Sequence, residues 1–396
     1  MRKLGFFLFF LPIWAVASVY VGFGKTDITP PVGTPSAGYQ ARQGDGMKGT
    51  NDPLLALALF IDNGEKKIVL CSVDNLGFTY EMVQKITALV HKEVPDCEVY
   101  VASTHTHSGG GAFLNIPVVG EALAGKYDPD IAKMYVEKTA EAIVLASRNT
   151  VKGKIGVGYG TAQNLSVYRS TWPEDVIPLS DVAVIKVTKE DDSPFAILFN
   201  FPVHPTVLPH QNRYFSADFV GYARDALKIP AIYFNGAQGD VNPIDAPCDQ
   251  IGEALAAVVK GVWDKTETSD NLEIFTKKLP YSLKPQATPK GIALPLETYK
   301  SEMNLIVLNG KDAFVTIPGE LSCVYDKKLK EAGKAMGYSH VSIFGLTNDA
   351  HGYIILPESW RNKTFESRLS FGGENYGDET EKRALSLLES QRPGIN

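Results

Sequence analysis

The sequence has few cysteines, no cluster of basic residues and no apolar run long enough to span a bilayer. Its four cysteines, among 396 residues, lie far apart and form no CxxC pair, so a zinc site built from thiolates is not expected. The net charge is −6, and because phosphate binding needs a basic face, nucleic acid is not expected as a partner. The composition, 44% hydrophobic and 21% charged, is that of a globular protein.

The cysteines themselves leave two interpretations open. In an oxidising compartment they could form up to two disulfides, and the sequence does not choose among the three pairings. Otherwise they are buried thiols, since none has neighbours that mark a nucleophile. They are Cys71, Cys97, Cys248 and Cys323.

Residues 1–17 have the pattern of a signal peptide. Arg2 and Lys3 supply the positive start, residues 4–16 are apolar, and the run ends in a small-x-small cleavage site at Ala17. A retained membrane anchor is the less favoured alternative, because the apolar run is shorter than the roughly 20 residues that cross a bilayer. We therefore predict an exported protein, periplasmic or secreted.

Beyond this segment, residues 18–396 are expected to form one domain in which apolar β-rich runs alternate with helical patterns. Strands are expected at 67–73, 98–103, 182–187, 195–201, 231–235, 304–308, 313–317 and 341–346, and helices at 80–92, 130–146, 217–227, 251–263 and 321–335. This alternation predicts an α/β fold with a mixed, largely parallel sheet flanked by helices. The Pro-rich stretch 279–296 is a linker or an insertion, and we favour an insertion because the motifs below fall on both sides of it.

The strongest local signal is a histidine pair at the end of a predicted strand. His105 and His107 lie in Ser-Thr-His-Thr-His-Ser, residues 103–108, and three glycines follow. Residues two apart in extended backbone point to the same side, so both imidazoles can face one cavity. Neutral imidazoles there would be good zinc ligands. A pair of solvated histidines is the alternative for this motif alone.

Three further polar residues follow other predicted strands. His204 comes directly after the strand at 195–201, and Glu320 and Tyr353 each follow a later strand. Ligand sites in open α/β sheets gather at the carboxyl ends of strands. Each residue also has a structural explanation. His204 could be a hydrogen-bonded histidine between prolines, Glu320 could be a carboxylate that complements a helix N-terminus, and Tyr353 could be a core residue.

Taken together, these residues form a plausible ligand set for a metal. His105, His204, Glu320 and Tyr353 supply the nitrogen and oxygen ligands that suit Zn²⁺. Bound zinc would lower the pKa of a water molecule and polarise a carbonyl oxygen. We therefore expect a zinc site at the carboxyl ends of the strands.

The motifs that contain these residues resemble those of the neutral/alkaline ceramidase family. They run in order over nearly the whole of residues 18–396. The matching segments are GFGKTDITP (22–30), THTHSG (104–109), VHPT (203–206), SADF (216–219), GDVNP (239–243), PGE (318–320) and NDAHGY (348–353).

The resemblance implies a role for each residue. The zinc ligands would be His105, His204, Glu320 and Tyr353. His107 would hydrogen-bond the reacting carbonyl or the water, and with Tyr353 it would stabilise the oxyanion or carry the proton to the leaving amine. Arg169, in Ser-Val-Tyr-Arg-Ser (166–170), would lie near the substrate.

Two departures from the family pattern stand out. Ceramidases usually carry serine in the Gly-Asp-x-Ser-Pro turn, where this chain has Asn242. No hydroxyl nucleophile is available there, so hydrolysis would use zinc-activated water, and Asn242 could donate to a developing oxyanion. In addition, the sequence ends soon after Tyr353, which leaves no room for the C-terminal β-domain of full-length ceramidases.

These features predict a zinc-dependent amidohydrolase that cleaves the amide bond of ceramide or a related N-acyl lipid. A zinc amidase acting on another N-acylated compound (a sugar, an amino acid or a peptidoglycan fragment) and a non-catalytic, metal-stabilised binding protein are the alternatives. A dinuclear phosphoesterase using Asp27, Asp74 and Asp240 is less favoured, because those carboxylates suit loop and capping roles equally well. A peripheral contact with a membrane stays open, and the oligomeric state is not indicated.

Overall fold

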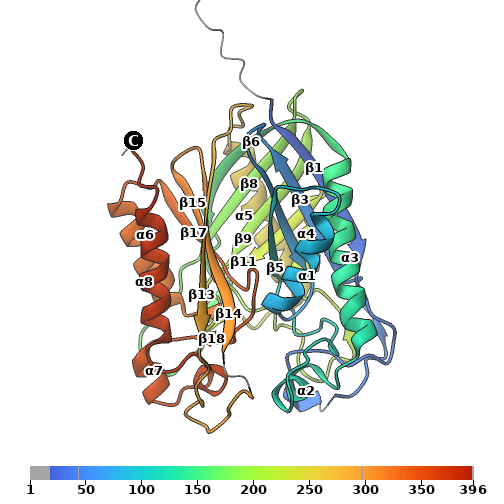
Figure 1. Cartoon of the computed structure of the whole chain (residues 1–396), viewed down its shortest axis with the longest axis vertical. Helices are drawn as coiled ribbons and strands as arrows, with labels where there is room; N and C mark the ends of the chain where they lie inside the picture. Colours follow the sequence, from blue (N-terminus) through green and yellow to red (C-terminus); the bar gives the residue numbers. More distant parts are fainter. Residues whose placement is uncertain (1–17, 43, 296–297, 395–396) are drawn as a thin grey trace, which may run out of the picture.

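The computed structural model describes residues 18–42, 44–295 and 298–394. The predicted signal peptide therefore lies outside the described residues. Figure 1 shows two β-sheets packed face to face, with helices on their outer faces. Among the described residues, no helix combines the length and the apolar character needed to cross a membrane.

The larger sheet has eight strands within the described residues. In spatial order they are β11 (Ala231–Asn235), β9 (Pro194–Phe201), β8 (Asp181–Lys189), β6 (Thr150–Thr161), β1 (Tyr20–Asp27), β3 (Leu55–Asp62), β4 (Lys67–Val73) and β5 (Cys97–Ser103). A smaller sheet contains β13 (Ile274–Leu283), β14 (Tyr299–Leu308), β15 (Asp312–Thr316) and β17 (His340–Phe344).

The prediction of a mixed α/β fold with a helix-flanked sheet is confirmed, but "largely parallel" is wrong. Of the described pairings in the large sheet, β4–β5 and β9–β11 are parallel and the others are antiparallel. The reason is the length of the connections. Residues 63–66 join β3 to β4 and residues 190–193 join β8 to β9; such short links make hairpins, whereas a parallel crossover needs a dozen residues or more. The Asn63-Gly64 pair is a typical hairpin signal.

The helices complete a four-layer arrangement. They are α1 (Tyr80–Val90), α2 (Val119–Ala124), α3 (Pro129–Arg148), α4 (Phe219–Leu227), α5 (Cys248–Lys265), α6 (Cys323–Ala335), α7 (Pro357–Arg361) and α8 (Tyr376–Glu389). Helices α1, α3, α4 and α5 cover the outer face of the large sheet. Helices α6 and α8 cover the outer face of the small sheet.

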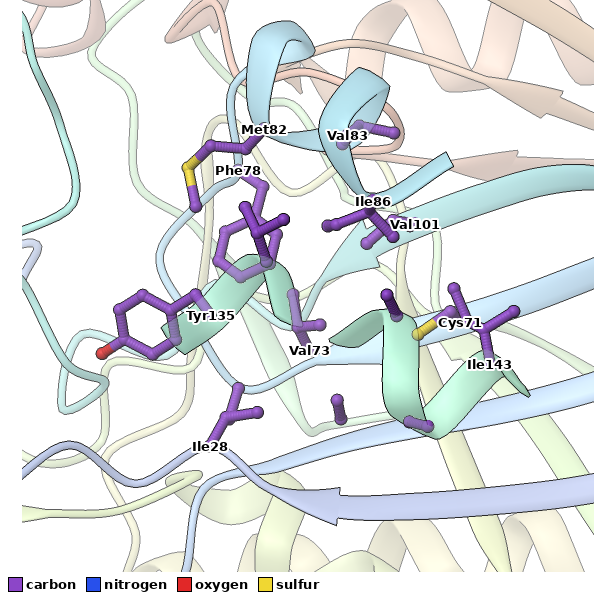
Figure 2. Close-up of a cluster of buried hydrophobic side chains, with 14 of the residues drawn as sticks. Ile28, Cys71, Val73, Phe78, Met82, Val83, Ile86, Val101, Tyr135 and Ile143 are labelled. Atoms are coloured by element: carbon purple, nitrogen blue, oxygen red, sulfur yellow. The ribbon is translucent and has the colours of Figure 1, made fainter. Parts of the chain in front are cut away.

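The alternation of side chains along each strand fills both faces of the large sheet. In β3, Leu57, Leu59 and Ile61 face the smaller sheet, while Ala58 and Phe60 pack toward α1 and α3. Figure 2 shows part of this second core, formed between those two helices and the strands. Because both faces are buried, the sheet is a rigid support for the loops at its ends.

The Pro-rich stretch at 279–296 starts inside a strand. Pro280 lies in β13, which pairs only with β14 among the described strands, and an edge strand tolerates proline because it needs no second ladder of hydrogen bonds. Residues 284–295 belong to the connection from β13 to β14. This segment is therefore an insertion within the smaller sheet, as expected.

Three two-stranded pairings lie beside the sheets, and two of them carry site residues. They are β2 (Gly49–Thr50) with β10 (Tyr214–Phe215), β7 (Ser166–Tyr168) with β12 (Val241–Pro243), and β16 (Glu320–Leu321) with β18 (Tyr353–Ile354). All four cysteines belong to the described part of the chain, where each is buried and unpaired. The structure thus contains buried free thiols and not disulfides.

A buried ion pair joins the large sheet to α4. Both oxygens of Asp74, at the end of β4, accept from the Arg224 guanidinium at 3.0 and 2.7 Å. Asp74 also accepts the backbone N–H of Leu55 at 2.9 Å. Removing one member of such a pair leaves an uncompensated buried charge.

We expect Arg224→Ala to lower the free energy of unfolding by about 3–5 kcal/mol, measured by urea denaturation. The control is Arg148→Ala, which removes an ion pair between the exposed Arg148 and Glu93 and should cost no more than about 1 kcal/mol. Equal losses in the two variants would contradict the assignment of this pair as a structural joint.

Candidate functional site

The loop after β5 places two histidines at the end of the large sheet. His105 has a φ of 70°, which non-glycine residues rarely adopt, and its backbone N–H donates to the carbonyl of Asn75. Its side chain is almost fully buried, with Nδ1 2.6 Å from the carbonyl oxygen of Leu76. Its Nε2 lies 3.3 Å from Nε2 of His107. The strained turn thus directs both rings toward one point.

His204 and Glu320 complete a compact cluster with this pair. His204 follows β9, is fully buried, and has Nδ1 2.6 Å from the carbonyl oxygen of Gln238. Glu320 Oε2 lies 3.1 Å from His105 Nε2 and 3.0 Å from His204 Nε2. The ligand atoms of His105, His107 and His204 all lie within 4.8 Å of one another.

The hydrogen bonds of this cluster fit a bound cation. A backbone carbonyl only accepts, so Nδ1 of His105 and of His204 carries the proton. Burial lowers the pKa of His204 to about 3; its ring is therefore neutral near pH 7, and Nε2 presents a lone pair. Oε2 of Glu320 presents lone pairs toward Nε2 of both histidines. Lone pairs that face one another in this way suit a metal ion such as Zn²⁺.

Tyr353 lies beside the cluster because β16 and β18 pair in parallel. In that register Tyr353 stands directly opposite Glu320. Its ring stacks on His204 with 6.3 Å between centroids, and its hydroxyl oxygen accepts from Arg169 Nη2 at 3.0 Å. Burial raises the pKa of Tyr353, so the phenol keeps its proton and can donate it in a hydrogen bond.

Arg169 connects this tyrosine to the Gly-rich turn that ends in β12. Its Nη1 donates to Asn242 Oδ1 at 3.0 Å, and Nη2 donates to the carbonyl of Gly239 at 2.7 Å. Because a guanidinium only donates, Asn242 must turn its carbonyl toward Arg169. The NH₂ group of Asn242 is thereby left to face another partner.

All seven residues singled out from the sequence thus gather at one end of the sheets. His105, His107, His204 and Glu320 form the cluster, while Tyr353, Arg169 and Asn242 adjoin it. The structure places these side chains together; the roles given to them above stay predictions.

Sequence reasoning missed Glu366, which fixes the orientation of Arg169. Glu366 is 1% exposed, and its Oε1 lies 3.2 Å from Arg169 Nε. Its other oxygen accepts from Ser170 Oγ at 3.1 Å. Glu366 lies in a short 3₁₀ helix, Glu366–Leu369, and no local pattern marks it, since the pairing spans almost two hundred residues.

Two more residues, Gly38 and Arg42, shape the loop that carries His107. Gly38 has a φ of 106°, and a Cβ atom there would lie 2.6 Å from His107 Cγ. Only glycine leaves room for the imidazole at this point. Arg42 is fully buried and donates to the backbone carbonyl of His107 and to Ser36 Oγ. The buried Arg42 guanidinium therefore fixes the backbone of this loop at His107.

The three carboxylates of the less favoured dinuclear site have other partners, and among the described residues they do not form a cluster that could hold a metal ion. Asp74 is paired with Arg224. Asp27 caps the backbone N–H of Thr29, and Asp240 accepts from Ser322 and from the backbone of Cys323. These are the capping and ion-pair roles that the sequence also allowed.

The cluster opens into a cavity of about 940 Å³. His105, His107, Glu320 and Tyr353 all border it. Its walls are mainly apolar and come from segments of both halves of the chain. They include Leu76, Met82, Phe113, Leu123, Val136, Leu283 and Phe371. The site can therefore admit a molecule with a long apolar part next to the polar cluster.

Comparison with known proteins gives sequence relatives and a structural match. Residues 19–229 match the family model for the N-terminal part of neutral/alkaline non-lysosomal ceramidases. Neutral ceramidase A of Dictyostelium discoideum is 28% identical over 225 residues, 52% of this chain and 31% of the relative. The neutral ceramidase of Pseudomonas aeruginosa is 25% identical over 219 residues, 51% of this chain and 32% of the relative. The aligned part thus spans about a third of the curated relatives.

The likeness in fold extends further along the chain. A crystal structure of neutral ceramidase from Pseudomonas aeruginosa superposes with a TM-score of 0.84 at 16% identity, over 95% of this chain and 75% of the other. A structure of a ceramidase complexed with C2 gives 0.83 at 15% identity, over 96% and 77%. The fold therefore continues through Glu320 and Tyr353, beyond the segment that the family model matches. The family model matches residues 19–229, which are more than half of the chain, so this protein belongs to the neutral/alkaline non-lysosomal ceramidase family.

Proposed function

We propose that this chain is a zinc-dependent amidohydrolase that cleaves the amide bond of ceramide or a related N-acyl lipid. The observation that carries the proposal is the buried cluster of His105, His204 and Glu320, whose lone pairs converge at 3.0–3.1 Å beside an apolar cavity. With Tyr353 they would hold the zinc ion. When bound, such an ion polarises a carbonyl oxygen and lowers the pKa of water.

His107 is suited to move the proton. Burial and its neighbours His105 and His204 lower the pKa of His107 well below its usual range, so the ring is neutral near pH 7. Amide hydrolysis consumes one water and yields a carboxylic acid and an amine. In this proposal His107 accepts the proton of the attacking water and returns it to the leaving amine nitrogen.

Tyr353 and Asn242 are suited to stabilise the oxygen that becomes negative. The Tyr353 phenol is protonated and held by Arg169, and the Asn242 amide is oriented by the same guanidinium. Donors that are fixed before reaction stabilise a developing oxyanion most effectively. Arg169, clamped by Glu366, keeps both donors in place.

The apolar walls favour a lipid over the other N-acylated substrates. The cavity also has polar lining residues, but a sugar or peptide fragment would leave those of its hydroxyls and amides unpaired that lie against the Leu, Met, Phe and Val side chains, and each unpaired polar group costs free energy. Export through the segment at 1–17 is part of the same proposal, because the sequence pattern there supports it.

The test is amide hydrolysis by the purified protein across N-acylsphingosines, N-acyl amino acids and N-acyl sugars, with and without a chelator. We expect cleavage of N-acylsphingosines, loss of cleavage with the chelator and recovery with zinc. Cleavage of N-acyl sugars or amino acids alone would mean that the substrate is not a lipid. Metal binding without turnover would favour a binding protein.

We expect His204→Ala to lower zinc content to near zero and to abolish amide hydrolysis, because one of the four proposed ligands is lost. Zinc is measured by elemental analysis of the purified variant. The matched control is His91→Ala, which removes an exposed histidine whose Nε2 contacts the carbonyl of Cys97 and should change neither quantity. A His204→Ala protein with full zinc occupancy would contradict the proposed site.

We expect Arg169→Lys to reduce kcat by about 10²-fold while zinc content stays unchanged. Lysine keeps the charge, but a single ammonium cannot hold Tyr353, Asn242 and Glu366 at once. Steady-state kinetics and elemental analysis measure the two quantities. An unchanged kcat, or a loss of zinc equal to the loss of activity, would show that Arg169 does not act through these donors.

A further inference from the structure

The loop before α2 contains a strained turn with an exposed valine at its tip. Val118 has φ 66° and ψ −62°, and the N–H of Val119 donates to the carbonyl of Pro117 at 2.7 Å. These values define a classic γ-turn, which is rare and strained, and a β-branched residue is the least suited to its centre. Yet Val118 is 81% exposed. No packing of the valine side chain therefore accounts for its presence there.

The same loop forms one wall of the cavity. Leu114, Ile116 and Val119 all border it, on either side of the exposed tip. The loop is closed tightly, since the N–H of Gly120 donates to the carbonyl of Ile116 at 2.8 Å. The same loop thus carries an apolar side chain at its exposed tip and three apolar side chains on the wall of the cavity that holds His105 and His107, with the polar Asn115 among them.

Other exposed apolar side chains belong to segments that reach the same site. Tyr127 is exposed and borders the cavity. Phe365 is 56% exposed, and its ring lies 5.4 Å from the Arg169 guanidinium. Exposed apolar groups that gather around a binding site mark an interaction surface.

We propose that the loop of residues 114–119 is an interfacial loop that inserts the Val118 side chain into a lipid bilayer and places the cavity at the membrane surface. The occupant is a lipid surface because one short loop carries both the exposed apolar tip and apolar side chains of the cavity wall. A bilayer in contact with the tip would lie next to the cavity, which shortens the path of a hydrocarbon chain through water. The net charge of −6 gives no general attraction to anionic lipid, so apolar insertion carries the contact.

The test is flotation of the full chain with phosphatidylcholine vesicles, which needs no turnover. We expect the protein to float with the vesicles at both low and high salt, and Val118→Asp to lower the partition coefficient about tenfold or more. Val151→Asp is the control, since Val151 is also exposed, at 37%. It pairs with Val21 near the start of β1, at the end of the large sheet away from the loop that carries His105. Equal loss in both variants, or no flotation of the unaltered protein, would overturn the proposal.

Val118→Gly separates insertion from folding. Glycine relieves the strain of the turn, so the melting temperature should not fall, while vesicle binding should fall as the side chain is lost. If Val118 had only a structural role, the glycine variant would bind vesicles as the unaltered chain does. That result would refute insertion of the valine.

Kinetics connect the loop to catalysis and rest on the proposed function. For Val118→Gly we expect an unchanged kcat/KM on a water-soluble short-chain N-acyl amide and a reduction of about tenfold on long-chain N-acylsphingosine in vesicles. Absence of turnover on both substrates in the unaltered chain would reject the proposed function and leave the flotation result standing. Equal rates of the variant and the unaltered chain on vesicles would reject the loop's role in substrate access.

Discussion

One carboxylate oxygen organises the site: Oε2 of Glu320 faces Nε2 of both His105 and His204. The histidines follow β5 and β9 of the large sheet, while Glu320 follows β15 of the smaller one. The contact therefore joins loops of the two sheets at their common end. Each imidazole is held at its other nitrogen by a backbone carbonyl, so the loops that supply those carbonyls also fix the direction of the lone pairs.

The sequence predicted well those elements whose signal is local. The strand at 67–73 and the strand at 231–235 have the predicted bounds, because uninterrupted apolar runs mark strands buried on both faces. The antiparallel middle of the large sheet was not predicted. Strands β1 and β3 went unassigned, although β3 leads into the Asn63-Gly64 hairpin turn. Strand direction depends on which neighbours pair, and that is a property of the whole fold.

The residues of the candidate site also fall into those that a local sequence pattern indicates and those that it does not. Residues that follow a strand within a recognisable motif, such as His105 and His204, could be named from the sequence. Glu366 and Arg42 could not, because their importance lies in partners far away along the chain: Arg169 in one case, and the backbone of His107 in the other. A buried charge has to be paired, but the sequence does not say with what.

If the site holds the proposed metal ion, the separation of its ligands along the chain couples metal binding to folding. His105 and Glu320 lie more than two hundred residues apart, so an unfolded chain presents the ligands as isolated groups with little affinity for a metal ion. Binding then favours the native state almost exclusively, and its free energy adds to the stability of the fold. With the metal bound, the two sheets should therefore be harder to separate. The ion would add to the hydrophobic packing and to the hydrogen bonds, such as that from Asn200 Nδ2 to the carbonyl of Ile343 at 3.0 Å, that already join them.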